Sequence, residues 1–129
     1  MSLEVSAFDE LYGLVLDEAS PDRVRGHVPI TDRCKQPYGL VHGGLLAAVA
    51  ETLASVGTAI AAHAEGNLSM GMSNSTSFLR PMREGTVHAD ARPLHRGRTT
   101  WIWDVEFTDD EGNLCAISRM TVAVRPPRA

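Results

Sequence analysis

The chain is organised around a glycine-containing stretch and the apolar segment after it, Tyr38-Gly39-Leu40-Val41-His42-Gly43-Gly44 followed by residues 45–62. Only four of the eighteen residues in that segment are polar, and only Glu51 is charged. Eighteen residues form an α-helix of about 27 Å, which is long enough to cross a small domain. Because the segment is rich in Ala and Leu and apolar on nearly every side, it predicts a helix buried in the centre of the fold.

The start of this helix is suited to binding negative charge. Gly43 and Gly44 stand where the helix begins, and the amides of a first turn have no acceptor within the helix. Glu51 and Ser55 are four residues apart, so they share one helical face beyond the glycines. A carboxylate, a hydroxyl and free amides could together serve one reacting carbonyl. The alternative is structural, because a lone carboxylate in an apolar helix also persists when it pairs with an arginine.

Length and composition predict one domain spanning residues 1–129. A chain of 13.9 kDa with 43% apolar residues has enough material for a single hydrophobic core. The formal charge of −4 and the pI near 5.7 disfavour binding of nucleic acid through overall charge, while a local basic patch stays open. We therefore expect no nucleic-acid partner.

Several residue types bear on compartment and metal binding. Cys34 and Cys115 belong to no C-x-x-C pair, which indicates reduced thiols and a cytoplasmic protein. The five histidines lack the spacing of zinc ligands, so no metal site is expected. The first residues lack the basic-then-apolar pattern of a targeting segment. Residues 45–62 reach the length of a membrane span, but Glu51 and the strand-like segments nearby favour a core helix.

The remaining segments predict one short helix and six strands. Phe8, Leu11 and Tyr12 recur at helical spacing and predict a helix that ends near Gly13. Alternating apolar and polar residues between turn residues predict strands over residues 14–19, 23–30, 69–80, 86–94, 99–108 and 114–124. Together they predict an α+β domain, with a mostly antiparallel sheet wrapped around one helix. The uncovered sheet face and edges predict a homo-oligomer.

Four motifs carry a resemblance to a known family. They are residues 38–44, the pair Ala50-Glu51, the run Ser73-Asn74-Ser75-Thr76-Ser77-Phe78-Leu79-Arg80-Pro81 and the run Thr99-Thr100-Trp101-Ile102-Trp103-Asp104. With these motifs, nearly the whole chain after about Leu14 resembles the hotdog-fold acyl-CoA thioesterases. The likeness is greatest to the branch of the Arthrobacter-type 4-hydroxybenzoyl-CoA thioesterase and the phenylacetate-pathway thioesterases, in which the central helix carries Glu rather than Asp.

The resemblance implies a catalytic site of five residues. Glu51 matches the catalytic carboxylate, acting as nucleophile through a mixed anhydride or as general base on water. Gly43 matches the residue whose backbone amide polarises the thioester carbonyl. Gln36 matches a side chain beside the thioester, and His42 a residue that orders the loop. Ser55 matches a threonine that positions the hydrolytic water or the carboxylate.

The resemblance also implies residues that bind CoA. CoA carries a pyrophosphate and a 3′-phosphate, anions that arginine binds in bidentate fashion. Arg80, Thr99 and Arg128 match contacts to the nucleotide. Arg98 stands where the close relative has Ser, so its contact with a phosphate is open. No metal and no cofactor are implied, because CoA is part of the substrate.

The implied activity is hydrolysis of an aromatic acyl-CoA, 4-hydroxybenzoyl- or phenylacetyl-like, by a homotetramer built as a dimer of dimers with active sites at the dimer interface. Val56 stands where the close relative has Glu, which makes the acyl pocket less polar and leaves medium-chain acyl groups open. A hotdog-fold dehydratase or hydratase is a second enzyme class, but its His-Phe-Pro-Gly stretch is absent. A non-catalytic acyl-CoA-binding module is a third possibility.

Overall fold

The computed structural model describes residues 4–128. Its elements in chain order are α1 (Ala7–Tyr12), β1 (Val15–Ala19), β2 (Val24–Pro29), the 3-10 turn η1 (Asp32–Cys34), α2 (Gly43–Ala64), β3 (Leu68–Phe78), β4 (Thr86–Arg96), β5 (Thr100–Thr108) and β6 (Leu114–Arg125). Both predicted helices and all six predicted strands are therefore confirmed. The central helix begins at the paired glycines, as predicted, and ends at Ala64, two residues beyond the apolar run.

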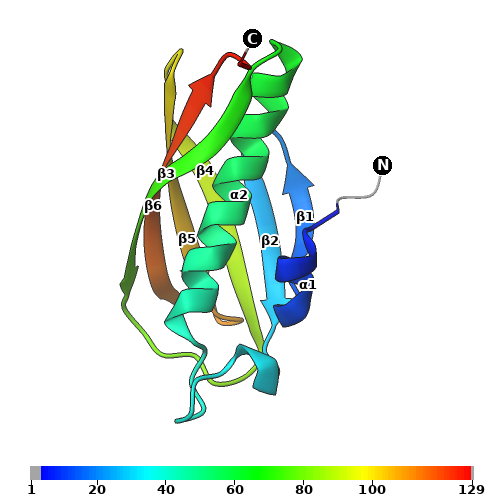
Figure 1. The fold of residues 1–129 in the computed structure, drawn as a ribbon. Coiled ribbons are helices and arrows are strands. Elements are labelled where there is room, and N and C mark those ends of the chain that lie inside the picture. Colours follow the sequence, from blue (N-terminus) through cyan, green and yellow to red (C-terminus); the bar gives the residue numbers. More distant parts are fainter. Residues whose placement is uncertain (1–3, 129) are drawn as a thin grey trace.

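The six strands form one sheet in the order β1-β2-β4-β5-β6-β3. Every neighbouring pair is antiparallel. The long helix α2 crosses one face of this sheet from end to end (Figure 1). The predicted α+β class and the hotdog fold, a sheet wrapped around one helix, are thus confirmed.

The core lies between α2 and the inner face of the sheet. On β5 the side chains of Trp101, Trp103, Val105 and Phe107 are buried, whereas the residues between them are more exposed. The Trp103 ring packs directly on Gly57 of α2, since a Cβ at Gly57 would lie 2.3 Å from the ring. Its indole N–H donates to Thr58 Oγ1 at 2.8 Å. Glycine at position 57 therefore lets the helix approach the sheet closely.

Within residues 4–128, no sheet covers the opposite side of α2. Glu51, Ile60 and His63 are exposed there, so the predicted burial of the helix is confirmed on its sheet side only. By length and composition α2 is apolar enough to span a membrane, a property that it shares with core helices of other proteins. Its other side packs on the sheet as the core helix of this domain.

A buried carboxylate fixes α1 against α2. Asp9 is only 3% exposed. The hydroxyl of Thr52, on α2, donates to both carboxylate oxygens of Asp9 at 3.0 Å. The hydroxyls of Ser6 and Tyr12 donate to the same carboxylate. These bonds hold α1 against α2 at Thr52, the residue that directly follows Glu51.

The edge strand β3 is exposed along nearly its whole length. Its apolar side chains Met70 and Met72 are 57% and 59% exposed. The pairing with β6 is interrupted by a bulge between Gly71 and Ser73. The Asn74 side-chain amide donates to the Ala47 carbonyl of α2 at 2.8 Å, which ties the strand to the helix. Such an edge is a template for pairing with another chain.

Candidate active site

The first turn of α2 is shaped by His42. This residue is the N-cap, with extended backbone. Its Nδ1 atom accepts a hydrogen bond from the Gly44 amide at 2.8 Å, so Nδ1 is the unprotonated ring nitrogen. Its own backbone N–H donates to the Cys34 carbonyl at 2.8 Å. His42 thereby joins the loop before the helix to the helix itself.

The backbone amide of Gly43 is the one amide in this turn that is available to a substrate. Within residues 4–128 no carbonyl or side chain accepts a hydrogen bond from the Gly43 N–H, whereas the neighbouring amides of His42, Gly44 and Leu45 are all bonded. The amide lies at the N-terminus of a helix of 22 residues. A free N–H in this place stabilises negative charge, such as that on the oxygen of a tetrahedral intermediate.

Gln36 approaches the same place from the preceding loop. Its side-chain carbonyl accepts a hydrogen bond from the Tyr38 amide. Its backbone N–H donates to the Leu40 carbonyl at 2.8 Å, and its backbone carbonyl accepts from Gly39 at 3.0 Å. Gly39 has a φ of +87°, which glycine adopts without strain. The turn fixes Gln36 and leaves its side-chain nitrogen without an acceptor in the described part of the chain.

Gln36 and Gly43 line a cavity of about 380 Å³. Its other walls are largely apolar and include Leu46 from α2, Phe78 and Met82 around the end of β3, and Cys115 at the start of β6. Burial raises the pKa of the Cys115 thiol, so this thiol stays protonated near neutral pH. The cavity therefore offers the Gly43 amide, the Gln36 side-chain nitrogen and the Arg80 guanidinium as hydrogen-bond donors among largely apolar walls, and no thiolate.

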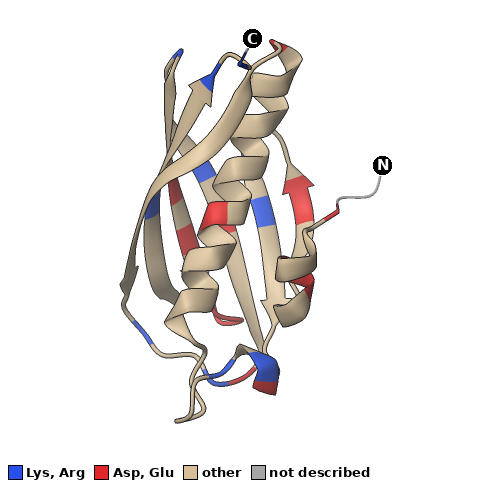
Figure 2. Ribbon diagram, viewed as in Figure 1, with Lys and Arg blue, Asp and Glu red and all other residues tan. Residues whose placement is uncertain are grey.

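Glu51 does not reach this cavity within one protomer. It follows Gly43 by eight residues on a continuous helix, so the two are about 12 Å apart along the axis. Its side chain is exposed and lies beside β3, where a Cβ at Gly71 would be 3.9 Å from Glu51 Cγ. Figure 2 shows it as the one acidic segment within α2. Ser55, half-buried, follows one turn later on the same face. The convergence of Glu51 and the free amide on one carbonyl, expected from spacing, is therefore not present in a single chain.

The four residues predicted to bind CoA fall at two ends of the molecule. The Arg80 amide donates to the Cys115 carbonyl, and the Thr99 carbonyl accepts from the Val124 amide. Cys115 and Val124 are nine residues apart on β6, which is about 30 Å in a strand. Arg98 and Thr99 share the turn between β4 and β5, and the C-terminus lies at that same end (Figure 1). Arg98, Thr99 and Arg128 are exposed, as is Arg80 at the far end.

The contacts of Asp9 and Phe78 with α2 were not foreseen. Asp9 carries no pattern that distinguishes it from a surface acid, and its partner Thr52 is 43 residues away. Phe78 was part of a motif without an assigned role, although its ring lies on Gly43. Arg125 donates to the Thr99 carbonyl at 2.6 Å, so it supports the turn that holds Arg98 and Thr99.

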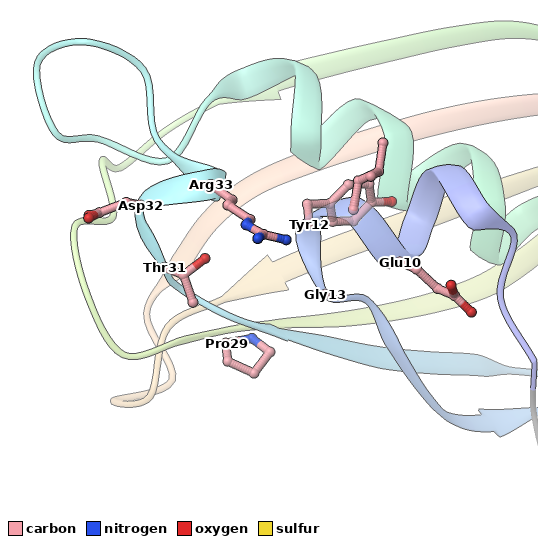
Figure 3. Close-up of a pocket in the computed structure, with 8 residues that line it drawn as sticks. Glu10, Tyr12, Gly13, Pro29, Thr31, Asp32 and Arg33 are labelled. Atoms are coloured by element: carbon pink, nitrogen blue, oxygen red, sulfur yellow. The ribbon is translucent and has the colours of Figure 1, made fainter.

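A second cavity, of about 510 Å³, lies between α1 and η1 (Figure 3). Arg33 points into it toward Tyr12, while Glu10 and Asp32 lie on either side and point outward. None of the predicted catalytic residues lines this cavity. The cavity at Gly43 is therefore the better candidate for the active site.

Comparisons with known proteins agree with the fold. The family model described as Thioesterase superfamily matches residues 38–116. The 1,4-dihydroxy-2-naphthoyl-CoA hydrolase of Escherichia coli is 35% identical over 103 residues, which are 80% of this chain and 75% of that protein. The matched region of the family includes Gly43, Glu51 and Arg80, whereas Gln36 and Arg128 lie outside it.

Solved structures give the same result. A mutant thioesterase from Pseudomonas aeruginosa is similar with a TM-score of 0.89 and 31% identity, covering 95% of this chain and 88% of that one. A thioesterase from Haemophilus influenzae has a TM-score of 0.82 and 30% identity, covering 94% of this chain and 84% of that one.

Proposed function

The chain belongs to the thioesterase superfamily and is a thioester hydrolase, and from this premise we propose that its substrate is an aromatic acyl-CoA, 4-hydroxybenzoyl- or phenylacetyl-like. The observation that supports hydrolysis of a thioester is the Gly43 amide, unpaired within residues 4–128, at the start of a helix whose only carboxylate is Glu51. The Escherichia coli relative acts, by its name, on an aromatic acyl-CoA, which supports an aryl group. A membership in the 4-hydroxybenzoyl-CoA branch is part of the same proposal.

The proposed chemistry uses water as the second substrate. In one form the Glu51 carboxylate attacks the thioester carbon, the CoA thiolate leaves, and water cleaves the resulting anhydride. In the other form Glu51 takes a proton from water, whose oxygen attacks the carbon directly; the CoA thiolate then leaves and receives that proton. The Gly43 amide stabilises the oxyanion in both forms, Gln36 donates beside it, and the Ser55 hydroxyl holds water or the carboxylate. The reaction needs neither metal nor cofactor.

The proposed active site is shared between two protomers. The 12 Å along α2 that separates Gly43 from Glu51, about eight residues of helix, favours a site in which each comes from a different chain. Antiparallel pairing of two β3 strands about their middle would bring the partner's Phe78 end, with its Gly43, toward Gly71 and Glu51. The exposed edge with Met70 and Met72 supports this pairing.

The same pairing would bring together the residues that are proposed to bind CoA. The Arg80 end of β3 would approach the partner's Leu68 end, which pairs with Arg125 beside the Thr99 turn. Arg80 of one chain would then bind phosphate together with Arg98, Thr99 and Arg128 of the other. We extend the proposal to a homotetramer formed by two such dimers in the cytoplasm, consistent with two buried free thiols.

The test is release of CoA thiol from a panel of aryl-, phenylacetyl- and straight-chain acyl-CoAs. We expect an aryl or phenylacetyl thioester to be cleaved with the highest kcat/KM. Glu51→Ala should lose at least about a hundredfold in rate, or about 2.7 kcal/mol of barrier, while staying folded. Glu111→Gln removes an exposed carboxylate in the turn between β5 and β6 and serves as the control.

Each alternative has its own outcome in this panel. Preference for straight chains over aryl groups would overturn the aromatic assignment in favour of a medium-chain acyl-CoA thioesterase. Binding of acyl-CoA by both wild type and Glu51→Gln, without thiol release by either, would replace the enzyme with a non-catalytic binding module.

A further inference from the structure

The side chain that lies closest to Gly43 is Phe78. It is the last residue of β3, 35 residues after Gly43 in the chain. A Cβ placed on Gly43 would lie 2.7 Å from Phe78 Cζ and 2.9 Å from Cε1, distances that real Cβ atoms do not adopt. The ring therefore occupies the space that any side chain at position 43 would need.

The same ring faces the cavity. Phe78 lines it together with Gln36 and the apolar side chains of Leu46 and Met82. Phe78 is nevertheless 60% exposed. A large aromatic side chain that is exposed on one face and seated on a glycine on the other leaves a flat apolar surface free for a ligand.

This placement affects the Gly43 amide, the one amide at the helix start without an acceptor in residues 4–128. A hydrogen bond to a developing oxyanion is stronger where water is excluded, because the local dielectric is lower. An aromatic ring beside the amide excludes water from one side. Divalent sulfur also packs favourably against aromatic rings, so the sulfur of a thioester can contact the Phe78 ring.

From these contacts we propose that Phe78 is a positioning residue for thioester hydrolysis. Its ring shields the Gly43 amide from water and supports the thioester group, so that the carbonyl oxygen is directed to the Gly43 N–H. The inference rests on the proposed function, since it presumes that Gly43 receives the carbonyl.

The kinetic test compares Phe78→Ala, Phe78→Leu and Phe78→Tyr with wild type on the best thioester of the panel. Loss of a whole oxyanion donor costs about 10²–10³ in rate, so loss of its shield should cost less, about tenfold in kcat. KM should change by less than about threefold, since the phosphate contacts remain. Phe78→Tyr keeps the ring and should restore kcat to within about twofold, with Phe78→Leu in between.

A matched control comes from β4. Leu94 is also a large apolar residue near the end of a strand and is 56% exposed, but it does not line the cavity. Leu94→Ala should leave kcat unchanged. A Phe78→Ala enzyme that is folded and keeps the wild-type kcat, or changes only in KM, would overturn the proposal. If Phe78→Ala does not fold, the comparison of Phe78→Leu with Phe78→Tyr decides in the same way.

An NMR measurement tests the contact without any turnover. The ring current of Phe78 should shift the Gly43 amide resonance, and Phe78→Leu should remove that shift, whereas Leu94→Ala should not. Exchange of the Gly43 amide proton with water should be faster in Phe78→Ala. An unmoved Gly43 resonance would overturn the inference whatever the activity. If wild type cleaves no thioester, the proposed function and the positioning role both fail, while the resonance still reports on the contact itself.

Discussion

Two properties meet at Gly43, and a pair of substitutions separates them. Its N–H has no acceptor in the described residues, and its side-chain position is filled by the Phe78 ring. As the first residue of α2 it stands where proline is tolerated, because proline lacks only an N–H that the helix does not use. His42 before it has ψ 128°, the extended backbone that a following proline requires.

We expect Gly43→Pro to keep the fold and lose activity. Removal of the amide donor should lower kcat by about 10²–10³. Gly43→Ala keeps the N–H and only displaces the exposed Phe78 ring, so its loss should be smaller and measures that displacement alone. The measurements are steady-state kinetics and thermal unfolding of both variants. A folded Gly43→Pro enzyme with kcat within about tenfold of wild type would contradict the role of the amide.

At the scale of elements, the contact between α1 and α2 depends on the Asp9 carboxylate, which accepts hydrogen bonds from three hydroxyl groups. Burial, together with the hydrogen bond to Asp9, raises the pKa of Tyr12 far above its usual value of about 10. Above that pH the unfolded chain ionises this tyrosine while the folded chain keeps its proton. Stability from Tyr12 is therefore present below about pH 10 and is lost as the pH rises above it.

The expected result is a fall of about 1.4 kcal/mol in the free energy of unfolding between pH 9 and pH 11 that Tyr12→Phe does not show. At pH 8 the variant should be less stable by about 1–3 kcal/mol, because the Asp9 carboxylate has lost a donor. Denaturant unfolding at fixed protein concentration measures both. Tyr38→Phe, which changes the other, exposed tyrosine, is the control. If the free energy of unfolding depends on pH equally in wild type and Tyr12→Phe, then the hydrogen bond to Asp9 does not keep Tyr12 protonated in the folded chain.

Prediction from sequence succeeded where the determining pattern is local. The long apolar run, the glycines before it and the alternation along each strand placed both α-helices and all six strands, because helix and strand periods are properties of neighbouring residues. The contacts Asp9–Thr52 and Phe78–Gly43 join residues 43 and 35 positions apart, and only the folded sheet brings them together. The separation of Gly43 from Glu51 was implicit in the helical rise, yet spacing on one face suggested convergence instead.

At the scale of the whole molecule, the proposed shared site makes one clear prediction about mixtures. Gly43→Pro and Glu51→Ala are each expected to be inactive. In a mixed dimer, one of the two sites combines an intact Gly43 from one chain with an intact Glu51 from the other. After random exchange of subunits the mixture should recover about one quarter of wild-type activity, as half of the dimers are mixed and each has one working site.

The control is the double variant, Gly43→Pro with Glu51→Ala, mixed with wild type. Its mixed dimers contain no complete site, so it should only reduce activity. Native mass spectrometry of an isotope-labelled partner verifies that exchange has taken place. Complete exchange without recovery would mean that each site lies within one chain.

The two tryptophans of the chain give the molecule an optical signal of its own. They stack with ring centroids 6.1 Å apart, and Trp103 rests on Gly57. Gly57 is fourteen residues from Gly43, about 21 Å along the helix. The coupled circular dichroism and the fluorescence of the two tryptophans thus report how α2 packs on the sheet. Both signals are insensitive to chemistry at the other end of α2. A substitution that silences the enzyme without altering this spectrum has changed the reaction and not the fold.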